Sequence, residues 1–318
     1  MFGLNDFLLG GAVPMAAAMV AFAVAWLAAR QAGVAWSAGV LVGFATGVVA
    51  LEARNSDFAS AALRLVKPRE SHEWLSLLGL LAILPALAGV SLGRFRVLRL
   101  ALAAALVAAT PLWLLRGGKY LPSQQVRDAG IVVESAWSIG DAALIVGTLA
   151  AAALAAWWLW EATESNHSPR VRSLLVTMAL IAAAATAGLT SSFTYAQLMG
   201  ALAAASGGAA AAAWLLGVKT GPEAAAGPLL VIAGGTLVLA MFYSSMRSWQ
   251  AAGLWVGLAF AAGWLPGVSR LRPLAAHALR CVACAIPLGL VLWQAGADFA
   301  ESQRQQQEAA ESNPYLNL

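Results

Sequence analysis

The chain has 318 residues, of which 61% are hydrophobic and only 11% are charged, and its formal net charge is +4. Soluble domains carry about 25% charged residues, so this composition excludes an ordinary water-soluble enzyme, a disordered chain and a nucleic-acid-binding protein. The two cysteines are too few for a disulfide scaffold. We therefore expect an all-α integral membrane protein in contact with the lipid bilayer.

Apolar segments long enough to cross a bilayer recur along the chain, separated by short polar joints. A hydrocarbon core about 30 Å thick requires about 20 apolar residues of helix. The pattern predicts a polytopic bundle of about ten transmembrane helices, within a range of eight to ten. The predicted spans are 8–30, 34–52, 74–93, 97–115, 136–160, 172–190, 194–217, 227–246, 249–267 and 277–296.

The basic residues bear on orientation and location. No Lys or Arg precedes the first apolar segment, so we expect a retained helix rather than a cleaved signal peptide. Arg30 follows that segment, and the cytoplasmic bias of Lys and Arg then places the N-terminus outside. The rule decides narrowly, because the 19 basic residues divide almost evenly between the two faces. The Ala-rich, Lys-poor composition is typical of a GC-rich bacterial coding sequence and favours a bacterial inner membrane.

The chain divides into one transmembrane domain over residues 1–297 and a polar tail over 298–318. Segment 53–73 is predicted to lie flat on the membrane as an amphipathic helix, with Phe58 and Leu63 among its buried apolar residues. The Gln-rich tail is either a helix outside the membrane or a flexible segment.

Glycines recur at four-residue spacing in two predicted spans. Gly39, Gly43 and Gly47 lie on one stripe of the second span, and Gly253 and Gly257 repeat the spacing in the ninth. Such stripes allow another helix to approach closely. The partner is either another span of this chain, a second copy in a homo-oligomer, or a different membrane subunit.

Two carboxylates are candidates for ion coupling. Glu134 and Asp141 are seven residues apart, so on one helix they share a face, with Ser138 between them. Ionisable groups at membrane depth mark ion or proton paths. The alternative is an interfacial extension whose carboxylates face water or pair with Lys119 or Arg127.

His277, Cys281 and Cys284 align along one stripe of the tenth span. Imidazole and thiol groups in this arrangement are weak candidates for binding copper or zinc. The alternative is a histidine at the membrane interface and two small apolar residues in a helix.

The segment 68–74 places His72 between Glu70 and Glu73 immediately before the third span. A histidine beside carboxylates is typical of a general base in a membrane-embedded enzyme. The alternative is the start of a helix anchored at the interface by Trp74.

In chain length and predicted helix count, the sequence resembles the drug/metabolite transporter group. The resemblance implies an all-helical carrier of small molecules. The paired five-span halves of that group are not found here, so the resemblance assigns no site residues.

Three functions follow from these features. The first is transport of a small solute or ion of undefined identity. The alternative is a non-catalytic membrane subunit that anchors a larger complex through its glycine stripes, and the third is a membrane-embedded enzyme. No nucleotide-binding or metalloprotease motif occurs, and the sequence identifies no cofactor.

Overall fold

The computed structural model describes residues 8–54, 56–84, 96–122, 134–162, 168–190, 192–263, 265 and 268–312. Its helices are α2 (Val13–Ala29), α3 (Ala32–Glu52), α4 (Phe58–Arg64), α5 (Trp74–Leu81), α7 (Arg96–Leu115), α9 (Ile139–Glu161), α10 (Pro169–Leu189), α11 (Phe193–Leu215), α12 (Ala226–Tyr243), α13 (Ser248–Ala262) and α14 (Pro273–Ser312). Three short helical turns are η1 (Leu8–Ala12), η2 (Pro222–Ala225) and η3 (Val268–Arg270). These elements confirm the predicted all-α fold.

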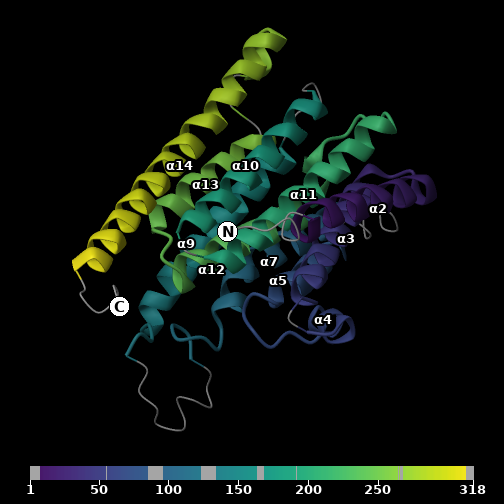
Figure 1. The fold of residues 1–318 in the computed structure, drawn as a ribbon. Coiled ribbons are helices and arrows are strands. Elements are labelled where there is room, and N and C mark those ends of the chain that lie inside the picture. Colours follow the sequence, from purple (N-terminus) through teal and green to yellow (C-terminus); the bar gives the residue numbers. More distant parts are fainter. Residues whose placement is uncertain are drawn as a thin grey trace.

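The long helices lie side by side, with α14 on one flank of the bundle and α2 on the other (Figure 1). Below, the end of the bundle that carries η2 is called the η2 end, and the opposite one the α4 end. Consecutive long helices joined by a short turn run in opposite directions between these two ends, as is typical of antiparallel helices in a bundle.

Seven helical segments among the described residues are long and apolar enough to cross a membrane. They are η1 with α2, α3, α9, α10, α11, η2 with α12, and α14. The remaining predicted spans fall on α5, α13 and the apolar part of α7, which are shorter. Part of the predicted span 74–93 lies outside the described residues. The membrane bundle is therefore confirmed, whereas the count of about ten crossings is not.

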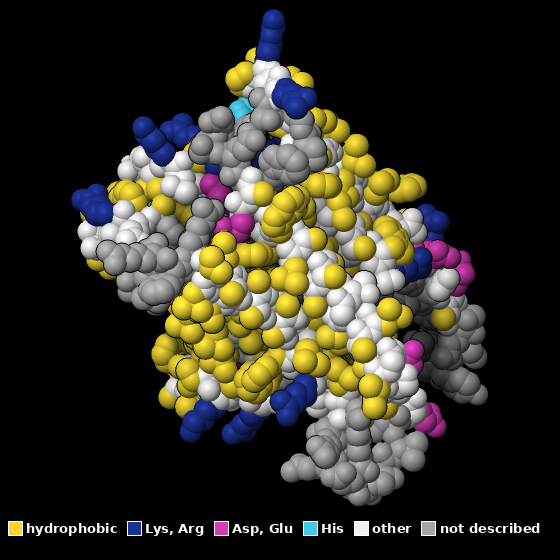
Figure 2. Space-filling model, turned by 180° about the vertical axis from the view of Figure 1, so that it is seen from behind, with side chains coloured by type: hydrophobic (Ala, Val, Ile, Leu, Met, Phe, Trp, Pro, Cys, Tyr) yellow, Lys and Arg dark blue, Asp and Glu magenta, His cyan; other side chains and the backbone are white. Residues whose placement is uncertain are grey.

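The surface has the character that a bilayer requires. Figure 2 shows a broad apolar face with Lys and Arg side chains at its upper and lower margins. Large apolar side chains such as Val20, Leu144 and Ile286 are exposed on their helices. Apolar patches of this extent are rare on soluble monomers and mark contact with lipid or protein.

Helix α3 packs closely against α2 and α11 through its glycines. Gly39, Gly43 and Gly47 face these two helices, and a Cβ atom at Gly43 would lie 2.7 Å from Ala18 Cβ and 2.8 Å from Ala205 Cβ. A side chain at this position would force the helices apart. The stripe therefore contacts helices of the same chain.

The second glycine pair brings α13 against α14. A Cβ atom at Gly253 would lie 2.6 Å from Val291 Cγ2, and one at Gly257 would lie 2.6 Å from Leu288 Cδ2. The two glycine faces on which the subunit hypothesis depends are thus occupied within this chain.

The predicted surface segment 53–73 is helical only over Phe58–Arg64, the range of α4. Asp57 begins this helix, because its side chain accepts a hydrogen bond from Ser60 N at 2.8 Å. The hydrogen bonds from Ser60 lower the pKa of the Asp57 carboxyl. Phe58 and Leu63 are 70% and 51% exposed, so α4 leaves two large apolar side chains uncovered by the rest of the protein.

Helix α14 has 40 residues and contains Pro287. At 1.5 Å per residue it is about 60 Å long, which is about twice the thickness of a hydrocarbon core. The polar tail predicted over 298–318 is helical up to Ser312, and residues 313–318 lie outside the described part of the chain.

Candidate functional site

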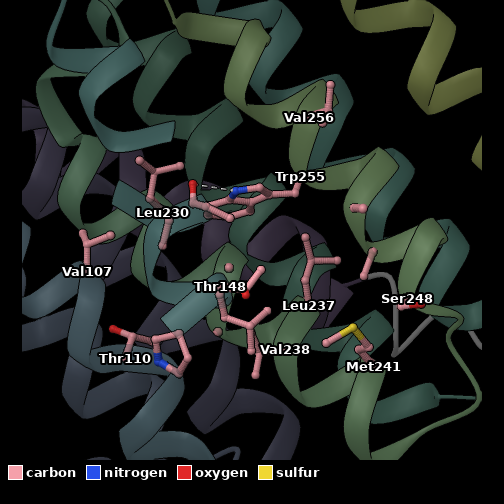
Figure 3. Close-up of a pocket in the computed structure, with 18 residues that line it drawn as sticks. Val107, Thr110, Thr148, Leu230, Leu237, Val238, Met241, Ser248, Trp255 and Val256 are labelled. Carbon is pink, nitrogen blue, oxygen red and sulfur yellow. Dashed lines mark hydrogen bonds between the residues drawn. The ribbon is translucent and has the colours of Figure 1, made fainter. Parts of the chain in front are cut away.

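An apolar cavity of about 300 Å³ lies between α7, α9, α12 and α13 (Figure 3). Val107, Leu230 and Val238 line it, and the indole of Trp255 extends into it from α13. Trp255 Nε1 donates a hydrogen bond to Ala152 O at 3.1 Å, which fixes the ring against α9.

The threonine hydroxyls of this cavity are already bonded. Thr110 Oγ1 donates to Leu106 O at 2.8 Å, and Thr148 Oγ1 donates to Leu144 O at 2.7 Å, each within its own helix. A cavity with so few open polar groups suits a hydrocarbon chain better than a polar solute.

A second cavity, of about 320 Å³, lies at the η2 end. Its lining includes Gln31, which immediately precedes α3, Ser37 from α3, Glu161 from the last turn of α9, and Glu223 from η2. Two carboxylates, an amide and a hydroxyl make this cavity polar, in contrast to the first.

The two cavities lie along the same helix faces. The lining residues recur three or four positions apart: Leu100, Ala103, Val107 and Thr110 on α7; Leu149, Ala153, Trp157 and Glu161 on α9; and Gly227, Leu230, Gly234, Val238 and Met241 on α12. This spacing places each set on one face of its helix. From Ala103 to Val107 the cavities are one turn apart, about 6 Å.

We call the two cavities together the α7–α9–α12 groove. On α9 it extends from Glu161 to Thr148, thirteen residues and about 20 Å of helix. It is polar at the η2 end and apolar from there to Met241 and Ser248 at the α4 end. This is the polarity of an amphiphile, with a head group at one end and a hydrocarbon tail at the other.

Glu223, which lines the polar part of the groove, has one buried oxygen without a partner. Its Oε1 pairs with Arg172 Nη2 at 2.8 Å and accepts from Gly221 N at 3.0 Å. Its Oε2 is buried without a hydrogen-bond partner, and so is Ser37 Oγ. Buried polar groups are normally bonded, so both oxygens fit a ligand that donates hydrogen bonds.

Buried side chains hold the polar end in place. Arg172 is 3% exposed, and Arg280, 1% exposed, donates from Nη1 to Gly263 O at 2.6 Å. Trp36 Nε1 donates to Thr220 O at 3.0 Å and ties α3 to the segment before η2. The Glu223 carboxylate therefore sits on a fixed support.

The structure separates the two carboxylates that the sequence analysis placed on one helix. Helix α9 begins at Ile139, so Glu134 lies outside it and shares no helical face with Asp141. Ser138 is the residue that caps this helix: its Oγ accepts from Asp141 N at 3.1 Å and donates to Asp141 Oδ2 at 2.7 Å. All three side chains are exposed, and Arg127 lies outside the described residues.

The second predicted cluster does not converge either. Cys284 is buried and its Sγ donates to Gly257 O at 3.3 Å, whereas Cys281 on the same helix is exposed. Among the described residues, the His, Cys and carboxylate side chains close enough together to hold a metal ion are Glu52, His72 and Glu73. His277 does not belong to this group.

The sequence analysis did not identify Glu161, Glu223 or Ser37 as site residues. The two glutamates lie near the ends of predicted spans, where charged residues are ordinary. Comparisons of the chain with protein-family models, with curated proteins and with solved structures find no match.

Proposed function

We propose that the protein is a membrane carrier for an amphiphile with a hydrocarbon tail and an amine-bearing head group. The observation that supports this is the alignment of a polar and an apolar cavity along the same faces of α7, α9 and α12. Glu161 and Glu223 supply the carboxylates that a positive head group needs, and the Glu223 oxygen not paired with Arg172, Oε2, is the acceptor for its hydrogen bond.

The groove is accessible from the bilayer. Helix α9 is peripheral, since only 11% of its most apolar stretch is buried in the bundle. An amphiphile therefore enters sideways from the membrane, with its tail still in contact with lipid. Because the groove runs along the helix axes, movement within it carries the head group across part of the membrane.

The proposal includes a location. With the N-terminus outside, in a bacterial inner membrane, the η2 end faces the cytoplasm. Arg30, Lys219 and Arg270 at this end then follow the cytoplasmic bias of basic residues. The head group is therefore captured from, or released to, the cytoplasmic leaflet.

Filling the apolar part of the groove tests the proposal. Ala152 and Ala151 are neighbouring exposed residues of α9, but only Ala152 lines the cavity. We expect Ala152→Phe to slow transbilayer movement of a fluorescent long-chain amine in reconstituted vesicles by about tenfold, because overpacking a site costs at least about 1 kcal/mol. Ala151→Phe should transport at the wild-type rate. Equal rates for the two variants would contradict the groove as the path.

A second variant tests the head-group end. Ser37 is fully buried and its hydroxyl has no partner, so Ser37→Ala removes no internal hydrogen bond. Stability should be unchanged, whereas transport of the amine should fall if the hydroxyl contacts the head group. A long-chain alcohol, which lacks the charge, should be transported more slowly than the amine by the wild-type protein.

Ion coupling through Glu134 and Asp141 stays a separate prediction. If Asp141 carries a coupling proton, Asp141→Asn abolishes the effect of a pH gradient on transport while the helix cap persists. If Asp141 only supports the cap with Ser138, the same variant keeps the gradient response and loses about 1 kcal/mol of stability at most. Glu134 lies outside α9, so the Glu134→Gln variant shows whether this carboxylate contributes to ion coupling independently of Asp141.

A further inference from the structure

A second cluster of polar side chains lies at the α4 end and shares no residue with the lining of the groove. Glu52 closes α3, and His72 and Glu73 immediately precede α5. Each of the three offers one possible metal-ligand atom, and these atoms all lie within 4.8 Å of one another. Chain segments 20 residues apart in sequence thus bring two carboxylates and an imidazole to one point.

The carboxylate of Glu73 is buried and held in a fixed direction. Its side chain is 3% exposed, and its Oε2 accepts hydrogen bonds from Arg69 N and, at 3.1 Å, from Glu70 N. Its Oε1 lies 3.6 Å from Arg64 Nη1. One oxygen therefore anchors the side chain, and the other is directed at the cluster.

Glu52 is less satisfied. Its Oε2 is buried without a hydrogen-bond partner, and the nearest cation is Arg64 Nη1 at 3.5 Å. The same guanidinium nitrogen therefore lies between the two carboxylates, too far from either for a good hydrogen bond. Arg64 is 41% exposed and belongs to the seven-residue helix α4, so it can leave without disturbing a core.

The histidine is arranged like a metal ligand. His72 Nδ1 lies 3.4 Å from Glu70 Oε2. Metal-bound histidines commonly direct their second ring nitrogen at a carboxylate, which fixes the ring. A cavity of about 220 Å³, lined by Glu52, His72, Thr194 and Gln197 among others, adjoins the cluster and has room for water ligands.

We propose that Glu52, His72 and Glu73 bind a divalent transition-metal ion, with Zn²⁺ the best match to one nitrogen and two carboxylate donors. Three protein ligands leave a coordination position open toward the cavity. Arg64 is the cation that balances the two carboxylates when no metal is bound, and the metal displaces it. The site lies apart from the α7–α9–α12 groove and does not depend on the carrier proposal.

Metal binding to the purified full-length protein in detergent tests the site, without any amphiphile present. We expect Zn²⁺ to compete with a chromophoric chelator at one equivalent, and Co²⁺ to give the visible absorption of a low-symmetry site. His72→Asn and Glu52→Gln should weaken Zn²⁺ binding by about 100-fold or more, since each removes a ligand, and Glu70→Gln by about tenfold.

Arg64→Ala is the most informative variant, because a metal site and a structural ion-pair network predict different effects of this change on Zn²⁺ affinity and on the melting temperature. Loss of the competing cation should tighten Zn²⁺ binding by about fivefold, the factor that corresponds to a partly exposed ion pair. The exposed neighbour Lys67 provides the matched control, and Lys67→Ala should bind like wild type. A structural network instead predicts that Arg64→Ala lowers the melting temperature and that Zn²⁺ does not restore it.

A control excludes the other soft ligands of the chain. The measurements are repeated with Cys281→Ser and Cys284→Ser combined, which removes the thiols of α14 and should leave Zn²⁺ affinity unchanged. Wild-type affinity in His72→Asn, or no Zn²⁺ binding by the wild type at micromolar concentration, would overturn the proposal. The His72→Asn variant keeps the ion pairs of Arg64 with Glu52 and Glu73, so a loss of Zn²⁺ binding in this variant does not come from losing them.

Discussion

Replacing Gly43 with leucine is expected to prevent the formation of a stable bundle. The backbone of α3 is in direct contact with α2 and α11 at this point, and a Cβ atom alone would lie 2.7 Å from Pro14 O and 2.8 Å from Ala205 Cβ. Overpacking typically costs about 1–3 kcal/mol, and here two rigid helices must separate along their length. Size-exclusion chromatography and thermal unfolding in detergent should show an aggregated or strongly destabilised protein.

The matched control is Gly200→Ala on α11. No atom lies within 4 Å of a Cβ at this position, so the change adds no clash. Alanine favours a helix over glycine by about 1 kcal/mol, and the variant should be as stable as the wild type or slightly more stable. If the Gly43→Leu variant eluted and unfolded like the wild type, α3 would not be in direct contact with α2 and α11 at this position.

Removing Arg172 alone is expected to destabilise the η2 end. Arg172→Leu leaves the Glu223 carboxylate, 2.8 Å from the lost guanidinium, without its charge partner. Breaking a buried pair in this way costs about 3–5 kcal/mol. The melting temperature in detergent should fall markedly.

A double variant distinguishes the pair from simple loss of packing. Arg172→Leu combined with Glu223→Gln removes both charges and should regain much of the lost stability, because neither member of the pair is left as an uncompensated charge. Arg170→Leu, an exposed neighbour on the same helix, should have little effect. Equal destabilisation of the single and double variants would show that the ion pair does not carry the effect.

The sequence predicts the helices well because their signal is long. The span predicted over 194–217 is observed as Phe193–Leu215, and that predicted over 227–246 as Ala226–Tyr243. The start of α9 differs from the prediction. The predicted span 136–160 includes Ser138, whereas in the structure Ser138 caps the helix. Apolar periodicity cannot separate a capped helix start from one more polar turn.

The groove was beyond sequence reasoning for a different reason. Most of its lining residues are Ala, Leu, Gly and Val, which are common throughout the predicted spans, so no pattern distinguishes a lining face from a lipid-facing one. Glu223 becomes a candidate only through its ion pair with Arg172, 51 residues away, and through its second oxygen, which is buried without a partner.

The candidate metal site was not predicted as one, because the sequence indicated either general-base catalysis or the start of a helix for its residues His72 and Glu73. In the sequence, segment 68–74 is distinguished by His72 and the glutamates that flank it. Glu52 and Arg64 complete the cluster from α3 and α4, and only the fold brings them there.

The length of α14 has a consequence for how the protein can be observed. Its first half packs on α13 through Gly253 and Gly257, whereas residues toward Ser312 continue as one helix beyond the thickness of a membrane. In a helix of this length, a small change of tilt in the packed half produces a large displacement at the far end. A spin label or fluorophore near Gln305 will therefore register rearrangements of the α13–α14 interface that a probe inside the bundle would miss.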